Sequence, residues 1–304
     1  IVGGGCAGLG AAIYARRFNM DVLVLTEGLG GTITTTHLVE NYPGFISLTG
    51  QELADKLIDH AKANNVEFKI GQRVSSIKKE GEIFKVKFGQ EELEARTVLL
   101  ATGTTYKKLN VPGEKEFSAR GVSYCATCDA GFFKKKNVIM VGGGDSAVKE
   151  SLILAEHAAH VTIVYRGEKI TKAEPINMKR MEATPNISVK LKTNIAEILG
   201  DQTSAQPGPV TKVKFDTGEE MPIEGVFIEI GRIPLTDMVN DLGVQKNEKG
   251  EIVINVMSET NVPGFYAAGD VTDTEWKQAI VGVTEGTKAA YMAFEYVSKQ
   301  KIAN

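Results

Sequence analysis

Cysteine is scarce in this chain, with 3 residues in 304, and histidine and tryptophan are rare too, with 4 and 1. So few cysteines exclude a small secreted scaffold held together by many disulfides. No apolar stretch reaches the roughly 18 residues that a membrane-spanning helix needs. A net charge of -3 lacks the basic excess of a nucleic-acid-binding protein. We therefore expect a cytoplasmic globular protein with neither a membrane nor a nucleic-acid partner.

Glycine, in contrast, is abundant, with 32 residues in 304 against an average near about 7%. The glycines gather at two places that resemble each other, residues 3–8 and residues 142–147. Each cluster follows a β-like apolar run and opens a helix-like stretch. A second β-like run comes next, at 21–25 or at 160–164. Strand, glycine turn, helix and strand in this order predict parallel sheets of the α/β class.

The length suggests about two domains at roughly 100–200 residues each. We expect two Rossmann-like dinucleotide-binding domains, one inserted into the other. Each should have the three-layer ββα architecture, with two sheets and one layer of helices. The predicted discontinuous domain comprises 1–110 and 238–304, and the predicted inserted domain comprises 111–237. Proline and glycine near 109–113 and 231–234 mark the candidate linkers between the domains. Because only two residues precede Gly3 and a strand needs about 5–6, we also expect that a few residues precede Ile1.

The glycine turns have the spacing of a phosphate-binding motif. In G-x-G-x-x-G the first glycine permits a tight turn, the second admits a pyrophosphate and the third lets the helix pack closely. These places are taken by Gly3, Gly5 and Gly8 in one unit and by Gly142, Gly144 and Ala147 in the other. The helix that follows offers free N–H groups to the phosphates. Two such turns in one chain predict two dinucleotides that exchange electrons.

Residues at the ends of the second strands are expected to contact the ribose. Glu27 lies 19 residues (27 − 8) after Gly8, the usual place of an acid that binds ribose hydroxyls. The corresponding place in the second unit holds Tyr165 and Arg166, with Lys169 and Lys172 nearby. A cation at this place suits the 2′-phosphate of NADP, although the neighbouring Glu168 opposes that reading.

The motif Cys125-x-x-Cys128 is compatible with a zinc site, with two buried thiols or with a redox disulfide. Zinc needs about four ligands, and neither a second such motif nor a well-spaced histidine pair is present, so we expect no metal. A redox disulfide opens on receiving two electrons. The adjacent Asp129 is suited to carry a proton to or from a thiolate. Cys6, inside the first glycine turn, is interpreted as a small filler.

These motifs together resemble the low-molecular-weight flavin-dependent thioredoxin reductases, and the resemblance runs almost end to end. Besides the two glycine turns and the cysteine motif at 124–129, it is carried by residues 30–31, 34–36, 40–44, 101–103, 266–270 and 278–280. The resemblance implies that the discontinuous domain binds FAD and that the inserted domain binds NAD(P)H. It also implies a homodimer that passes electrons from the nucleotide through the flavin and the disulfide to thioredoxin or a thioredoxin-like protein.

By the same resemblance, Cys128 is the thiol nearest the flavin, Cys125 attacks the partner disulfide and Asp129 is the acid. The implied FAD contacts are Gly3, Gly5, Cys6, Ala7, Gly8, Glu27, Gly31, Thr32, Asn41, Ala101, Thr102, Gly103, Gly269, Asp270, Lys277, Gln278 and Ala279. The NAD(P)H contacts that we expect are Gly142, Gly144, Asp145, Ser146, Ala147, Tyr165 and Arg166, with Lys169 and Lys172 as substitutes for missing family arginines.

The chain departs from the family pattern where the 2′-phosphate should bind. The family has His-Arg-Arg and a further Arg four residues later, whereas this chain has Tyr165-Arg166-Gly167 and then Thr171. NADH or ferredoxin is therefore an alternative donor to NADPH.

Alternative functions are a reductase for a peroxiredoxin system, a dithiol oxidase that uses O₂, and a non-catalytic redox sensor. Thr32 also replaces the family's glutamine at the flavin.

Overall fold

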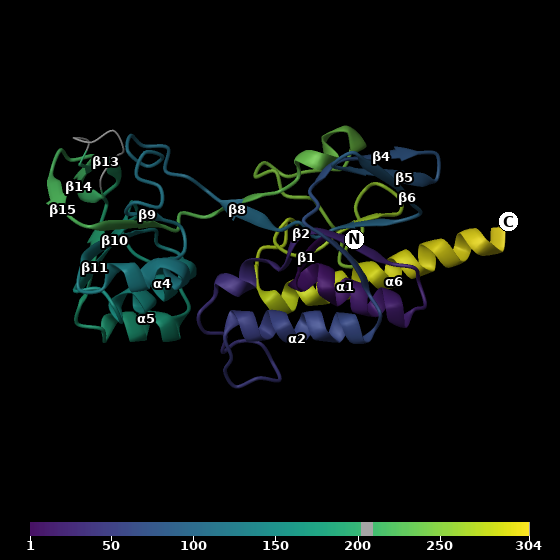
Figure 1. The fold of residues 1–304 in the computed structure, drawn as a ribbon, viewed down its shortest axis with the longest axis horizontal. Helices are drawn as coiled ribbons and strands as arrows, with labels where there is room; N and C mark the ends of the chain where they lie inside the picture. The colour runs from purple at the N-terminus through teal and green to yellow at the C-terminus, as the bar shows by residue number, and fades with distance from the viewer. Residues whose placement is uncertain (202–208, 304) are drawn as a thin grey trace. The chain divides into compact units, whose positions relative to one another are not determined.

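The computed structural model describes residues 1–201 and 209–303, and these form two compact units (Figure 1). We call Ile1–Thr105 with Ile233–Asn304 the outer unit, and Tyr106–Arg232 the inserted unit. The chain passes between the units after Thr105 and again after Arg232, five residues before the predicted boundaries in each case (110 − 105 and 237 − 232). The two connecting segments, β8 (Thr104–Tyr106) and β17 (Arg232–Pro234), pair as a two-stranded sheet.

The outer unit is built on a parallel sheet with the strand order β18-β7-β1-β2-β3. Its strands are β1 (Val2–Gly5), β2 (Leu23–Gly30), β3 (Glu67–Ile70), β7 (Val98–Leu100) and β18 (Phe265–Ala267). An antiparallel sheet consists of β4 (Val74–Glu80), β5 (Ile83–Phe88) and β6 (Glu91–Ala95). The helices are α1 (Cys6–Arg17), α2 (Gly50–Ala63) and α6 (Ala279–Ala303), with short turns η1 (Gly31–Thr35) and η3 (Asp237–Leu242). Within this unit, Figure 1 shows the helices on one face of the parallel sheet and β4–β6 on the other.

The inserted unit repeats this plan, with a parallel sheet in the order β12-β11-β10-β16-β9. Its strands are β9 (Val122–Ser123), β10 (Asn137–Val141), β11 (His160–Tyr165), β12 (Ile187–Leu191) and β16 (Gly225–Ile228). The antiparallel sheet consists of β13 (Ile195–Gly200), β14 (Val210–Phe215) and β15 (Glu220–Pro222). The helices are α3 (Ala126–Asp129), α4 (Asp145–Ala155) and α5 (Pro175–Glu182). The short turn η2 (Ala130–Phe133) directly follows α3. The repeated topology confirms the prediction of two Rossmann-like ββα domains, one inserted into the other.

Each unit has its main core between its two sheets. In the outer unit Phe84, Phe88, Leu100 and Phe265 are completely buried in one cluster. The inserted unit has an equivalent cluster around Ile139, Val213 and Phe215. The strands that form these clusters read as apolar runs in the sequence, because a sheet covered on both faces needs apolar side chains on both. Burial of these side chains is the main favourable contribution to folding of each unit.

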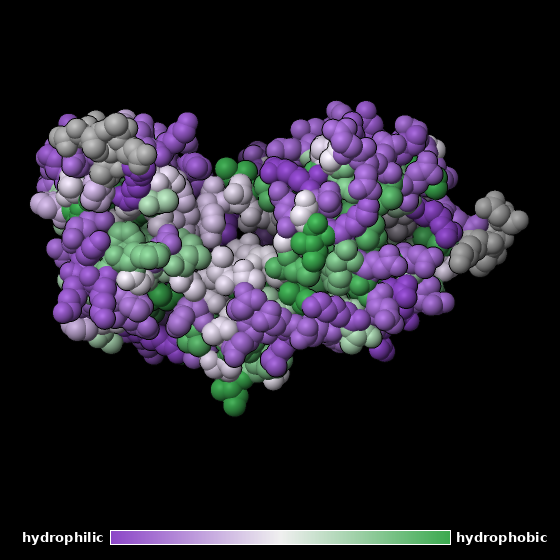
Figure 2. Space-filling model, viewed as in Figure 1, coloured by the Kyte–Doolittle hydropathy of each residue, from purple (hydrophilic) through white to green (hydrophobic). Residues whose placement is uncertain are grey.

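Polar and charged side chains cover most of the surface of each unit in the view of Figure 2. Among the helices of residues 1–201 and 209–303, none combines the length and the apolar character needed to cross a bilayer.

Small residues allow α1 and α6 to pack closely in the outer unit. Ala11 on α1 and Ala289 on α6 are fully buried. At Gly286 a Cβ atom would lie only 2.1 Å from the carbonyl oxygen of Ala7. Because that obstacle is backbone and not a flexible side chain, the two helices would have to separate to accept any larger residue. This contact joins the C-terminal segment to the first glycine turn.

We predict that Gly286→Ala destabilises the protein by about 1–3 kcal/mol, the usual cost of overpacking a close contact. Helix propensity alone would change stability in the opposite direction, since alanine is the better helix former. The measurement is thermal unfolding followed by circular dichroism. The matched control is Gly28→Ala, whose Cβ would meet nothing within 4 Å. Equal midpoints for the two variants would contradict the prediction.

Candidate active site

The first glycine turn is tightly packed at its ends and open in its middle. A Cβ atom on Gly3, whose φ is 113°, would lie 2.1 Å from the carbonyl oxygen of Ala101. A Cβ atom on Gly8 would lie 2.0 Å from the carbonyl oxygen of Gly3. At Gly5 the nearest atom would be 3.7 Å away. The outer glycines are therefore required by protein packing, whereas the backbone at the middle one is accessible to a pyrophosphate.

The second turn repeats this arrangement in the inserted unit. Gly142 has a φ of 151°, and a Cβ atom there would lie 2.2 Å from the carbonyl oxygen of Glu229 and 2.9 Å from the Cβ of Ala147. A Cβ atom on Gly144 would meet nothing within 4 Å. Both turns lead directly into a helix, α1 or α4, whose first N–H groups are available to phosphate oxygens. Each turn therefore fits a dinucleotide.

Segments that are far apart in the sequence meet around the first turn. A Cβ on Gly31 would lie 2.9 Å from the Cα of Gly5, and one on Gly269 would lie 3.0 Å from the Cβ of Ala7. Asn41 donates from Nδ2 to Oε1 of Gln278 at 3.1 Å, although 237 residues separate them. Ala279 begins α6. Most residues implied as FAD contacts thus belong to one continuous region of the outer unit.

Cys6 is a protonated thiol in this region. Burial, assisted by the charge of Asp270, raises the pKa of Cys6 to about 12. A thiol with this pKa forms very little thiolate at neutral pH, and the thiolate is the reactive form. The interpretation of Cys6 as a small filler fits this environment, and the effect of Asp270 indicates that the C-terminal segment approaches the first turn.

Several side chains implied as FAD contacts already have protein partners. Lys277 pairs through Nζ with Oε1 of Glu251 at 3.1 Å and also donates to the carbonyl oxygen of Thr272. Glu27 lies 3.8 Å from Arg73 in an exposed ion pair. The hydroxyl of Thr102 donates to the carbonyl oxygen of Leu235 at 2.7 Å. Of the remaining implied residues, Thr32 lies in η1. Gly103, which has a φ of 65°, directly precedes β8.

The sequence analysis missed Glu285, which holds the loop that carries Asp270. Its carboxylate is buried and accepts from the backbone N–H of Gly269 at 2.7 Å and from the hydroxyl of Thr274. A buried carboxylate with these partners fixes the path of the loop. Position 285 lies on α6, 16 residues from Gly269, so only the tertiary fold reveals the contact.

In the inserted unit the ring of Tyr165 lies over the second turn. A Cβ atom on Gly143 would lie 2.4 Å from this ring, and one on Gly167 would lie 2.5 Å from it. Lys172 is exposed and its backbone pairs with that of Gly144. Arg166 and Lys169 are exposed as well, and so is Ser146. The cations predicted for a 2′-phosphate are thus accessible to a ligand.

Two acidic residues near this turn are engaged with other parts of the inserted unit. Glu168 pairs with Lys192 at 2.8 Å. Asp145 accepts from the backbone N–H of Glu174 at 2.8 Å and from Nδ2 of Asn177 at 2.9 Å, and it pairs with Lys149 at 2.9 Å. Burial would raise the pKa of Asp145, but these hydrogen bonds and the cation hold it below its ordinary value. Asp145 therefore anchors the start of α5.

Cys125 and Cys128 form a disulfide with a Cα–Cα distance of 5.4 Å, as the redox interpretation predicts. Cys125 is half-buried and caps the N-terminus of α3, where its Sγ accepts from the backbone N–H of Cys128 at 3.1 Å. Cys128 is exposed. A backbone N–H directed at the sulfur favours the thiolate when the disulfide is open.

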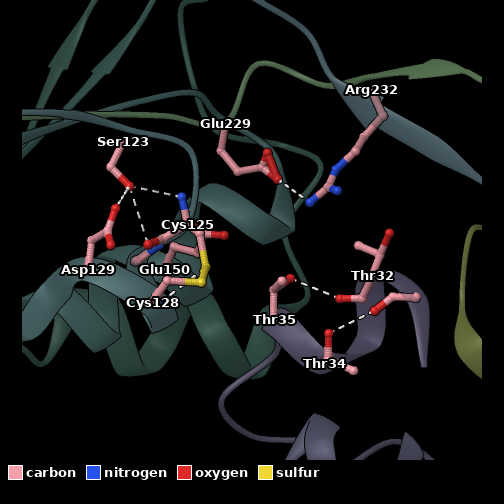
Figure 3. The surroundings of a disulfide bond; sticks show 12 residues. Thr32, Thr34, Thr35, Ser123, Cys125, Cys128, Asp129, Glu150, Glu229 and Arg232 are labelled. Atoms are coloured by element: carbon pink, nitrogen blue, oxygen red, sulfur yellow. Dashed lines mark hydrogen bonds and ion pairs between the residues drawn. A yellow bond between two sulfur atoms is a disulfide. The ribbon is translucent and has the colours of Figure 1, made fainter. Parts of the chain in front are cut away.

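Ser123, which no sequence motif indicated, links the disulfide to the predicted acid (Figure 3). Its buried hydroxyl donates to Oδ2 of Asp129 at 2.6 Å and accepts from the backbone N–H of Cys125 at 3.1 Å. Asp129 is thereby held in one orientation at the end of α3. The sequence offers no periodicity or spacing that singles out this serine, because the contact depends on the turn between β9 and α3.

Glu114 anchors the other side of the cysteine motif. Its buried carboxylate accepts from the hydroxyl of Tyr124 at 2.7 Å, from the backbone N–H of Leu109 at 2.9 Å and from that of Asn110 at 2.5 Å. Burial and the hydrogen bond to Glu114 raise the pKa of Tyr124. The residue before Cys125 is therefore fixed to the segment that leads into the inserted unit.

A second acidic group lies at the start of α3. Glu150, on α4, accepts through Oε2 from the backbone N–H of Ala126 at 3.2 Å. Burial, reinforced by the charge of Glu229, raises the pKa of Glu150 to about 8. Glu229 pairs with Nη2 of Arg232 at 2.9 Å, and Arg232 stacks over the ring of Tyr106 at 4.0 Å. Sequence reasoning missed this group too.

Comparison with known proteins assigns the family. The family model described as pyridine nucleotide-disulphide oxidoreductase matches residues 1–286. The thioredoxin reductase of Bacillus subtilis is 41% identical over 303 residues, which cover 98% of this chain and 94% of that protein. The crystal structure of Lactococcus lactis thioredoxin reductase in its FR conformation superimposes with a TM-score of 0.92 at 35% identity, covering 98% of both chains. That of T. acidophilum thioredoxin reductase gives 0.90 at 38% identity, covering 98% and 97%.

These similarities extend over nearly the whole chain, and the matched residues 1–286 span both glycine turns and the two cysteines of this chain's disulfide. The chain therefore belongs to the pyridine nucleotide-disulphide oxidoreductase family, and within it to the thioredoxin reductases.

Proposed function

We propose that this protein is a flavin-dependent thioredoxin-disulfide reductase. It takes two electrons from a reduced pyridine nucleotide and delivers them through the Cys125–Cys128 pair to the disulfide of thioredoxin. The observation that carries the proposal is the disulfide itself, closed across the first turn of α3 with Asp129 beside it. The relatives named thioredoxin reductase support thioredoxin as the partner.

Each unit has its own part in this proposal. When bound, FAD supplies a two-electron carrier between the nucleotide and the disulfide. The outer unit would hold it through the open backbone at Gly5 and the region that joins Gly31, Asn41, Gly269 and Gln278. The inserted unit would hold the nucleotide pyrophosphate at Gly144.

The thiol chemistry needs two proton-linked exchanges. Two electrons and two protons open the Cys125–Cys128 bond to two thiols. The thiolate of Cys125 then attacks the partner disulfide, which forms a mixed disulfide and releases one partner thiolate. Cys128 attacks the mixed disulfide, releases the second partner thiol and re-forms the original bond. Asp129, oriented by Ser123, gives the leaving thiolate its proton and takes one from the attacking thiol.

For the donor we propose NADPH, with weaker discrimination against NADH than an arginine cluster provides. Arg166, Lys169 and Lys172 are exposed near the second turn and supply the positive charge. Gly167 and Thr171 stand where the family has arginines. A lysine is a point charge and does not replace the bidentate contact that arginine makes with phosphate.

The donor proposal predicts that NADPH reduces the bound flavin faster than NADH does, by about tenfold, the effect of roughly 1.4 kcal/mol of differential binding. The measurement is anaerobic stopped-flow absorbance at equal concentrations of NADPH, NADH and reduced ferredoxin. Arg166→Ala should remove most of the difference between the two nucleotides. Reduction by ferredoxin alone would refute the nucleotide donor and leave the disulfide chemistry unaffected.

The disulfide proposal predicts that Cys128→Ser abolishes reduction of thioredoxin, by about a thousandfold or more, because the mixed disulfide loses the thiol that resolves it. Reduction of the flavin by its donor should persist in the same variant. The readouts are thioredoxin-dependent turnover and single-turnover flavin absorbance. Normal turnover would exclude a redox role for the pair, and O₂ consumption with a dithiol donor would indicate an oxidase.

The role of Ser123 predicts that Ser123→Ala slows thioredoxin reduction about tenfold without slowing flavin reduction, since only Asp129 and the backbone of Cys125 lose a partner. The readouts are thioredoxin-dependent turnover and single-turnover flavin absorbance. Ser188→Ala is a matched control in the same unit, because Ser188 bonds His160 on a different strand. Similar turnover in both variants would rule out the positioning role.

We also propose that the protein is a cytoplasmic homodimer, as expected from the family resemblance. Light scattering coupled to size-exclusion chromatography measures the molar mass and thereby tests the homodimer. A monomer that keeps full turnover would contradict the homodimer.

A further inference from the structure

The N-terminus of α3 receives a carboxyl group that the proposed thiol chemistry does not use. Glu150 reaches it from α4, 24 residues further along the chain, and Oε2 accepts from the backbone N–H of Ala126. Ala126 is fully buried and follows Cys125 directly. Figure 3 draws Glu150 together with the two cysteines. The carboxyl group is thus placed at the backbone that joins the two cysteines.

The backbone N–H groups of this turn are the ones that act on the sulfurs. The N–H of Cys128 is directed at Sγ of Cys125 at 3.1 Å. Free N–H groups at the start of a helix carry partial positive charge and favour a thiolate. The N–H of Ala126 is taken up by Glu150 instead. A negative charge on that carboxyl opposes a thiolate on Cys125, whereas a neutral carboxyl does not.

The charge of Arg232 acts on the carboxyl groups of both Glu229 and Glu150. The side chain of Glu229 is 3% exposed and pairs through Oε1 with Nη2 of Arg232 at 2.9 Å. Its other oxygen, Oε2, is buried and accepts no hydrogen bond from the described residues. Arg232 also stacks on Tyr106. Because the cation is already paired, a second negative charge on Glu150 is disfavoured.

Two other charged side chains on α3 and α4 already have partners. On α3, Asp129 accepts from Ser123. On α4 itself, Lys149 pairs with Asp145, which also holds the start of α5. The charge of Glu150 therefore depends mainly on its burial, on Glu229 and on Arg232.

We propose that Glu150 is a positioning residue of the redox centre, whose carboxyl group holds the N–H of Ala126 and thereby sets how strongly the first turn of α3 stabilises a thiolate on Cys125. The electrons of the disulfide reaction do not pass through Glu150, and its proton is not consumed.

This role has a defined dependence on pH. Burial and the charge of Glu229 raise the pKa of Glu150 to about 8, so the carboxyl is mostly neutral below this pH and negative above it. As the pH rises through this value, the new charge opposes ionisation of Cys125. The thiol and the carboxyl then titrate as a coupled pair, and neither follows a single simple curve.

The experiment measures the alkylation rate of Cys125 in protein reduced with dithiothreitol, with iodoacetamide from about pH 6 to about pH 10, a range that covers both groups. Peptide mass spectrometry separates Cys125 from Cys128 and Cys6. Wild type should show two coupled steps. Glu150→Gln keeps a hydrogen-bond acceptor without the charge, so it should show one step. Between about pH 8 and the pKa of the Cys125 thiol it should react up to about tenfold faster, the effect of a one-unit lower thiol pKa, and the two curves should converge at higher pH.

Glu219→Gln is the matched control, since Glu219 is an exposed glutamate of the same unit that pairs with Lys190. It should reproduce the wild-type curve. Identical curves for wild type and Glu150→Gln would overturn the proposal. If Glu150→Gln does not fold, as judged by circular dichroism, a single simple step in wild type overturns it equally. The assay needs neither thioredoxin nor a nucleotide, so failure of the proposed function leaves its outcome interpretable.

Discussion

In each unit the strand that leads into the glycine turn, β1 or β10, brings a residue so close to a neighbouring carbonyl that only glycine fits. The missing Cβ of Gly3 would lie 2.1 Å from the carbonyl oxygen of Ala101, and that of Gly142 would lie 2.2 Å from the carbonyl oxygen of Glu229. This approach sets the turn that follows and leaves the backbone at Gly5 and Gly144 open to a phosphate group. The position of each dinucleotide site therefore follows from a steric requirement inside the protein.

The same approach connects the second turn to the redox centre. It fixes the backbone of Glu229, whose side chain is buried and shares its surroundings with Glu150 at the start of α3. A helix as short as α3 has little stability of its own, because one turn costs more conformational entropy than its hydrogen bonds return. Its geometry depends on Ser123, which binds the carboxylate of Asp129, and on Glu150, which binds the backbone N–H of Ala126. It also depends on Glu114, which binds the hydroxyl of Tyr124.

The duplicated topology separates two tasks. Both units use the same order of strands around a glycine turn, but only the inserted unit carries the cysteine pair. In the outer unit the third motif position is Gly8, and close packing extends to α6 through Gly286. In the inserted unit Ala147 takes that position, and α4 contributes Glu150 to the redox centre.

The sequence alone determined both glycine turns, the α/β class, the insertion of one domain into the other and the redox pair, because each rests on a local motif or on an alternation of elements. The tertiary structure alone decided the residues that support the site. Ser123, Glu114, Glu150 and Glu285 are ordinary polar residues without a motif. Their importance comes from burial and from backbone N–H groups that other segments present. Lys277 and Asp145, assigned to ligands from the sequence, also have partners within the protein. A local pattern specifies a backbone turn, but a buried carboxyl acquires its role only when the fold brings its hydrogen-bond donors to it.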